Sequence, residues 1–177
     1  MKKLFFLFIL IIALIFSILF LNWSGSNISL ELKEGKIFFN NKEDFLVEEI
    51  SAEKLLALED HQLIKIKIAE HILTVEVVNT AESINQGLSG RDKIGSDGML
   101  FVFPEKEIVK FWMKEMRFDL DLVWMDDDKI VDITANVPAP TKDMQLSDLS
   151  IYNPKVPVNI VLELEAGKAA SLGLEES

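Results

Sequence analysis

The stretch "GMLFVFPEKEIVKFWMKEMRFDLDLVWMDDD", residues 98–128, decides the fold, because short apolar runs alternate in it with charged turns. In "LDLVWM", Leu120, Leu122 and Trp124 would share one face of a strand, and Asp121 would lie on the other face with Val123. Short aromatic-rich runs bounded by turn residues are typical of strands. The stretch therefore predicts three strands, at "GMLFVF", "VKFWMK" and "LDLVWM".

The same pattern continues on both sides of this stretch. Upstream, "LIKIKI" and "ILTVEVV" alternate in hydropathy and predict a hairpin, and Thr80 can cap a short helix in "TAESINQGL". Downstream, "KIVDITANV" and "VNIVLEL" predict strands on either side of a long loop, and "EAGKAASLGL" predicts a turn or short helix. Many short strands with few helices predict a mainly β fold, a compact antiparallel β sandwich or barrel with one or two short helices.

The N-terminal run "LFFLFILIIALIFSILFL", Leu4 to Leu21, carries no charge. As a helix it would span about 27 Å, close to the thickness of a bilayer core. We therefore predict a transmembrane signal-anchor helix over residues 1–23. A cleaved signal peptide is the alternative, but its apolar region is normally only about 7–15 residues long. Lys2 and Lys3 precede the run, which predicts a cytoplasmic N-terminus and a C-terminal domain outside the cell membrane.

Residues 24–62 are predicted to be a spacer ahead of the β domain, which we place at residues 63–177. Within the spacer, "ISLELKEGKIFF" alternates in hydropathy on both sides of a Gly and indicates a short hairpin. "KEDFLVEEISAEKLLALED" has mostly apolar residues, from Phe45 to Leu58, at loosely helical intervals and indicates a short amphipathic helix. A flexible tether is the alternative for the whole segment.

The composition excludes several classes of function. The chain has 177 residues, with 18 basic and 29 acidic side chains and a net charge of -11. Such an acidic surface repels phosphate backbones, so we predict no nucleic-acid partner. Without cysteine the chain has no disulfide, thiolate zinc site or Cys nucleophile, and His61 and His71 alone do not make a multi-His metal site. No nucleotide-binding motif appears, so neither a metal nor a cofactor is predicted.

Asp121 raises the question of a site, because an acid beside apolar neighbours on a strand needs a partner. Lys114 and Arg91 are the candidate partners. In the structural interpretation, Asp121 forms a buried ion pair with one of them. In the functional interpretation, Arg91, Lys114 and Asp121 line a ligand pocket together with Trp112, whose indole would stack on a flat ligand face. The structural interpretation is the simpler one, because buried ion pairs also occur without function.

Other polar residues fit weaker functional patterns. Asp119 and Asp121 are two apart, a spacing that would let two carboxylates act as acid and base. The run from Asp126 to Asp128 lacks the alternation and the Gly of calcium loops. Ser89 in "GLSG" lacks the frame of a nucleophile elbow. These residues are therefore interpreted as turn and surface positions.

Several motifs occur together in one order, namely "GLSGR", "GMLFVFP", "FWMK", "LDLVWMD" and "VLELEAG". In this the chain resembles the family called domain of unknown function 192, over about residues 63–174. The resemblance implies a mainly β fold of jelly-roll-like sandwich type and no established activity. Glu115 stands where the family commonly has Asn, and Asp119 where it commonly has Pro, so neither takes a family role.

The anchor and the β domain together predict a membrane-anchored extracytoplasmic module. It would bind a cell-envelope ligand such as a glycan, a peptide or another protein. One alternative is a hydrolase-type enzyme that uses Asp121 with Lys114 or Arg91. A second alternative is a scaffold with no ligand pocket.

Overall fold

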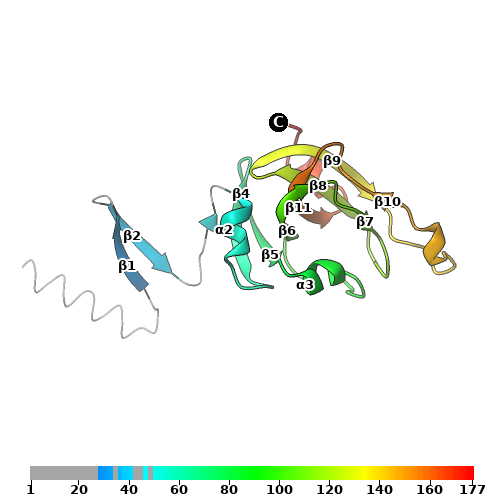
Figure 1. The fold of residues 1–177 in the computed structure, drawn as a ribbon, viewed down its shortest axis with the longest axis horizontal. Coiled ribbons are helices and arrows are strands. Elements are labelled where there is room, and N and C mark those ends of the chain that lie inside the picture. The colour runs from blue at the N-terminus through cyan, green and yellow to red at the C-terminus, as the bar shows by residue number, and fades with distance from the viewer. Residues whose placement is uncertain (1–27, 34–35, 42–45, 48–49) are drawn as a thin grey trace, which may run out of the picture. The chain divides into compact units, whose positions relative to one another are not determined.

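The computed structural model describes residues 28–33, 36–41, 46–47 and 50–177 (Figure 1). The predicted anchor at residues 4–21 lies outside these residues. Within the described ranges, no helix combines the length and the apolar character that crossing a membrane requires. The chain divides into two compact units, Met1–Phe45 and Leu46–Ser177, and each is described by itself.

In the first unit, the described residues form a two-stranded antiparallel sheet. β1 (Ile28–Lys33) pairs with β2 (Lys36–Asn41), and Lys33 lies opposite Lys36. The hairpin predicted from the alternating pattern of this segment is therefore confirmed.

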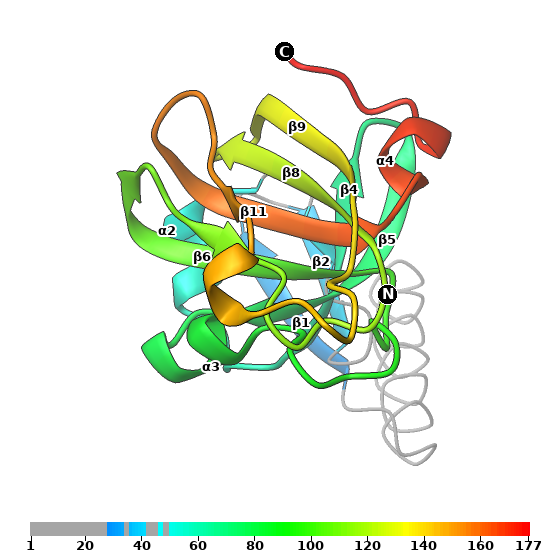
Figure 2. The ribbon, with the colours of Figure 1, turned by 90° about the vertical axis from the view of Figure 1, so that its right-hand side faces the viewer.

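The second unit is built on a seven-stranded sheet in the order β3-β4-β5-β6-β11-β8-β9. Figure 2 shows β9, β8, β11 and β6 side by side in that order. The strands are β3 (Leu46–Val47), β4 (Leu63–Ile68), β5 (His71–Val78), β6 (Gly98–Glu107), β8 (Leu120–Asp126), β9 (Lys129–Val137) and β11 (Val158–Glu165). β11 lies between β6 and β8 and is antiparallel to both, so both of its backbone edges are paired. All of its residues except Glu165 are buried.

Short elements complete the unit. They are the helices α2 (Ala52–Leu56), α3 (Ala81–Gln86) and α4 (Lys168–Ser171), a 3-10 turn (Leu146–Asp148), and the strands β7 (Phe111–Trp112) and β10 (Ile151–Tyr152). β7 and β10 pair with each other in a separate small sheet. Thr80 caps α3 as predicted, because its side chain accepts a hydrogen bond from the Ser83 amide.

The prediction of a mainly β domain with few short helices is confirmed. Two strand pairs depart from the predicted antiparallel arrangement, since β3 runs parallel to β4 and β5 runs parallel to β6. The β5–β6 connection passes through α3 and a loop, and such a crossover permits parallel pairing where a tight turn does not. β6 also continues beyond Pro104 to Glu107, and the strand predicted in "VKFWMK" is reduced to Phe111–Trp112.

Each face of the seven-stranded sheet carries its own apolar cluster, because alternate residues of the central strands point in opposite directions. On β6, Leu100 and Val102 join the cluster that contains α2, whereas Phe101 and Phe103 join the cluster on the side of α3. We call these the α2 face and the α3 face. Leu55 of α2 is fully buried, so the compact unit begins well before residue 63.

Candidate functional site

A pocket of about 710 Å³ opens on the α3 face of the sheet. Its volume lies in the range that small-molecule sites occupy, about 300–1,000 Å³. α3 and the residues after it form one wall, and the chain from β6 to β7 forms the other. The apolar lining includes Ile84, Leu88, Phe101, Phe103, Phe111 and Trp112.

Phe111 organises the aromatic side of this pocket. Its ring packs edge-on against Phe101 at a centroid distance of 5.0 Å and against Phe103 at 6.4 Å. It also meets the buried Trp124 at 5.5 Å. Such edge-to-face contacts restrain the rings more than area burial alone. The pocket wall is therefore held in shape by the core beneath it.

Glu163 reaches this pocket from β11, and it was not among the residues that the sequence singled out. The residue is only 6% exposed. Within the described part of the chain, its Oε2 atom is buried and makes no hydrogen bond. Burial raises the pKa of Glu163 to about 8. We call this residue the pocket acid.

The strand pairing explains why the pocket acid is buried. Glu163 lies opposite Met99 on β6 and opposite Leu122 on β8, and both of these residues are buried. Its backbone carbonyl also approaches Gly98 so closely that a Cβ atom there would lie 2.8 Å from that oxygen. A carboxyl in such surroundings is costly to ionise without a partner, so it favours the neutral form.

Asp121 was predicted to pair with Lys114 or Arg91, and within residues 50–177 this prediction is wrong. Asp121 is fully buried and accepts hydrogen bonds from two backbone amides, Asn136 N at 2.8 Å and Ala169 N at 2.9 Å. It points to the α2 face with Val123, as predicted, and the pocket lies on the α3 face. The sheet itself therefore separates Asp121 from the pocket.

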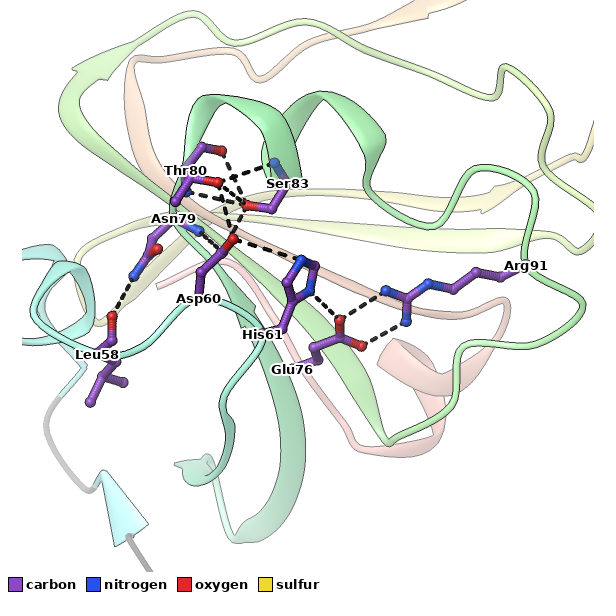
Figure 3. A network of polar contacts seen from close by, with 8 residues as sticks. All are labelled: Leu58, Asp60, His61, Glu76, Asn79, Thr80, Ser83 and Arg91. Atoms are coloured by element: carbon purple, nitrogen blue, oxygen red, sulfur yellow. Dashed lines mark hydrogen bonds and ion pairs between the residues drawn. The ribbon is translucent and has the colours of Figure 1, made fainter.

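Arg91 belongs to a different contact, with Glu76 of β5. Its two terminal nitrogens lie 2.6 and 2.8 Å from the Glu76 carboxylate oxygens (Figure 3). The Arg91 hydrogen bonds hold the pKa of Glu76 below its usual value, against the effect of burial. The same bonds raise the pKa of Arg91. Arg91 thus fastens the loop after α3 to β5.

Trp112 and Lys114 do come together, but Asp121 and Arg91 are not with them. Trp112 is 44% exposed and lines the pocket. The Lys114 Nζ atom lies 5.8 Å from the centroid of the Trp112 ring, within the range of a cation–π contact. Of the four predicted site residues, Trp112 is therefore the one that lines the pocket.

A polar network on Asp60 holds the start of α3 (Figure 3). Asp60 accepts hydrogen bonds from the Ser83 and Thr80 hydroxyls and from the Asn79 amide. Burial acts to raise the pKa of Asp60, but these hydrogen bonds outweigh it and lower the pKa. The Ser83 and Thr80 hydroxyls donate to Asp60 beside the Thr80 cap, so Asp60 supports the start of α3. His61 Nδ1 lies 2.7 Å from Glu76 and belongs to the neighbouring contact of that residue with Arg91.

The remaining candidates have structural roles. Asp119 accepts the Ala139 amide, and the Ser89 hydroxyl donates to the Lys114 carbonyl. Asp127 accepts a hydrogen bond from the Asn159 side chain and pairs with Lys106. Among the residues that the structure describes, no group of three or more His, Cys, Asp or Glu side chains is placed to hold a metal ion.

The sequence does contain a signal for the pocket acid. Glu163 interrupts the apolar run of the predicted strand "VNIVLEL". A continuous apolar run indicates a strand buried on both faces. An acid in the middle of such a strand is then buried wherever its side chain points, and this inference requires no knowledge of the partner strands.

The comparisons with known proteins agree with the fold. The sequence profile of the family DUF192, described as "Uncharacterized ACR", matches residues 64–177. The chain therefore belongs to the DUF192 family, as its motifs indicated. Among curated proteins no match is found.

Two solved structures are similar to this chain. One is a protein of Sinorhizobium meliloti 1021 that is named provisionally as a transcription regulator; it is 32% identical, with a TM-score of 0.54, over 63% of this chain and 85% of its own. The other is a protein of unknown function from Novosphingobium aromaticivorans DSM 12444. It is 24% identical, with a TM-score of 0.58, over 68% of this chain and 86% of its own. The second likeness concerns the fold alone.

Proposed function

We propose that this member of the DUF192 family is a ligand-binding domain whose site is the pocket on the α3 face. One observation carries the proposal: the pocket acid is buried against apolar strands, yet it lines an open, aromatic-walled pocket. A buried acid without hydrogen bonds is costly, and such groups are concentrated where a ligand supplies the missing partner. The ligand would place a polar group near Glu163 and an apolar body against Phe101 and Trp112.

We further propose that residues 1–23 anchor the domain in the cell membrane, with the residues between this anchor and the compact unit as spacer and the β domain outside. The apolar length of residues 4–21 and the two lysines before them support this topology. The ligand would then be a component of the cell envelope, such as a glycan, a peptide or a protein segment. The jelly-roll-like sandwich that the family resemblance implies belongs to the same proposal. The separate sheet of β7 and β10, whose Phe111 and Tyr152 pack against the apolar cluster on the α3 face, supports it.

We do not propose that this chain binds DNA, although the similar Sinorhizobium meliloti protein is named provisionally as a transcription regulator. The net charge of -11 would repel a phosphate backbone. The hydrolase alternative based on Asp121 is dropped, because both oxygens of that residue accept backbone amides on the opposite face of the sheet.

A fragment screen tests the binding site. The full chain, in lipid nanodiscs and with methyl-labelled apolar side chains, would be exposed to a library of small organic fragments and observed by NMR. We expect shifts at Ile84, Leu88 and Met116, which line the pocket. Ile68 and Ile130, which line a second hollow on the other side of the domain, serve as the internal control. If no fragment moves the pocket methyls, or if both hollows respond alike, the proposed site is wrong.

The topology has a separate test. Protease would be added to intact cells from which the outer envelope layers have been removed, and the chain would be followed with a C-terminal tag. We expect the domain to be digested before lysis. Protection until lysis would place the domain inside the cell and would rule out an envelope ligand, while leaving the pocket itself untouched.

A further inference from the structure

We propose that the pocket selects an organic ammonium ion, whose N–H groups donate to the Glu163 carboxylate while its apolar body lies against the aromatic wall. The inference rests on the proposed binding function and names the chemical class of the ligand. Three features of the pocket support it: the charges of the lining residues, the aromatic side chains of the walls, and the missing hydrogen-bond partner of the buried Glu163 carboxyl.

The charges in the pocket favour a cation. Three of its lining residues are charged: Glu163 at the base and the exposed Glu107 and Lys110. On the elements packed around Glu163, Asp121 of β8 faces the other side of the sheet, and Glu82 of α3 is exposed. The rise in the pKa of Glu163 comes from burial, with no contribution from a charged neighbour. An anionic ligand would bring a second negative group next to the desolvated Glu163 carboxyl. A cation would instead supply the counter-charge that the Glu163 carboxylate lacks.

The walls favour an organic body on that cation. Phe101, Phe103, Phe111 and Trp112 line the same pocket as the acid, and Phe101 and Phe103 pack against Phe111. Aromatic faces attract ammonium groups, and Lys114 already places its own ammonium over the Trp112 ring. A bare metal ion would need several oxygen ligands, which a single carboxylate between apolar strands does not provide.

Binding of such a ligand releases a proton. The neutral Glu163 carboxyl loses its proton to solvent, and the resulting carboxylate accepts N–H donation from the ammonium group, so the ligand keeps its own charge. Below about pH 8, where the free carboxyl is protonated, affinity should rise about tenfold for each unit of increasing pH. A neutral alcohol that hydrogen-bonds to the protonated acid should show no such rise.

The test uses the full chain in phosphatidylcholine nanodiscs, with empty nanodiscs as blank. Three probes of similar shape are compared: phenethylammonium, phenethyl alcohol and phenylacetate. Affinity is measured by titration calorimetry from pH 6 to 8.5, and the Glu163 carboxyl is followed by NMR. We expect phenethylammonium to bind tightest, to gain affinity with pH, and to lower the titration midpoint of Glu163 from about 8.

Two variants complete the design. Glu163→Gln keeps the shape of the side chain but not its charge. It should weaken the binding of phenethylammonium by more than about tenfold and change the affinity for phenethyl alcohol little. Glu165→Gln, at an exposed position two residues further along β11, should bind like the wild type. Equal or tighter binding of the alcohol or of phenylacetate, or an ammonium affinity that does not change with pH, would overturn the cation while leaving the pocket as a binding site. Failure of all three probes, together with failure of the fragment screen, would remove the binding function itself.

Discussion

Asp121 and Glu163 are buried acids on neighbouring strands, and they differ in what surrounds their oxygens. β8 and β11 pair so that Asp121 lies opposite Leu164 and Glu163 lies opposite Leu122. Asp121, on the α2 face, receives two backbone amides, whereas Glu163, on the α3 face, lies among apolar side chains beside a pocket. A buried acid is therefore not by itself a sign of function; the supply of hydrogen-bond donors separates the structural Asp121 from Glu163, for which we propose a ligand as the missing partner.

The largest loss of stability is expected at Asp121, because both of its carboxylate oxygens accept backbone hydrogen bonds. Asp121→Asn replaces one acceptor oxygen by an NH₂ group that faces a backbone N–H, and it removes a charge-assisted bond to Asn136 or Ala169. We expect a loss of about 3 to 4 kcal/mol in the free energy of unfolding, measured by urea denaturation. Asp119→Asn is the matched control, because that exposed acid accepts a single amide. A loss no larger than in the control would contradict the structural role of Asp121.

The next largest loss of stability is expected at Gly98, which packs against the backbone carbonyl of Glu163. In Gly98→Ala the new methyl group would lie 2.8 Å from the Glu163 carbonyl oxygen, which is backbone and cannot move without shifting β11. We expect a loss of about 2 to 3 kcal/mol in the free energy of unfolding. NMR should show chemical-shift changes along β6 and β11. Retention of full stability would mean that the two strands can separate locally, and that Glu163 is held less firmly than its burial suggests.

The pocket acid should leave its own signature in the pH dependence of stability. Burial raises the pKa of Glu163 from 4.5 to about 8, so between these values the folded state holds a proton that the unfolded state has lost. Stability must then fall as pH rises through this window, by about 2 kcal/mol between pH 6 and pH 8. Glu163→Gln removes the effect, so the variant should gain stability over the wild type as pH rises. Parallel unfolding curves across pH would show that Glu163 is already ionised or paired.

The sequence predicted most of the strands, and the reason is visible in the sheet. β4 alternates between lysines and buried isoleucines, and β8 places Leu122 and Val123 on opposite faces, so periodicity alone assigns them. Parallel pairing of β5 with β6 was missed, because strand order depends on contacts between distant segments that periodicity does not encode. Hydrogen-bond donors for Asp121 were missed for the same reason: they are backbone groups of distant residues, and every residue type except Pro carries one.

The smallest effect is expected at Glu76, an acid paired with a base, where pH should act in the opposite direction to that at Glu163. Arg91 lowers the pKa of Glu76, so this pair stabilises the fold above the unfolded pKa, and the contribution is lost as pH falls through the lower folded value. Arg91→Met should cost about 1 kcal/mol at neutral pH and progressively less in acid. A double-mutant cycle with Glu76→Gln, followed by thermal unfolding across pH, isolates the pair. A coupling energy that persists in acid would mean that Arg91 acts through packing, and the contrast between paired and unpaired acids would then rest on Asp121 alone.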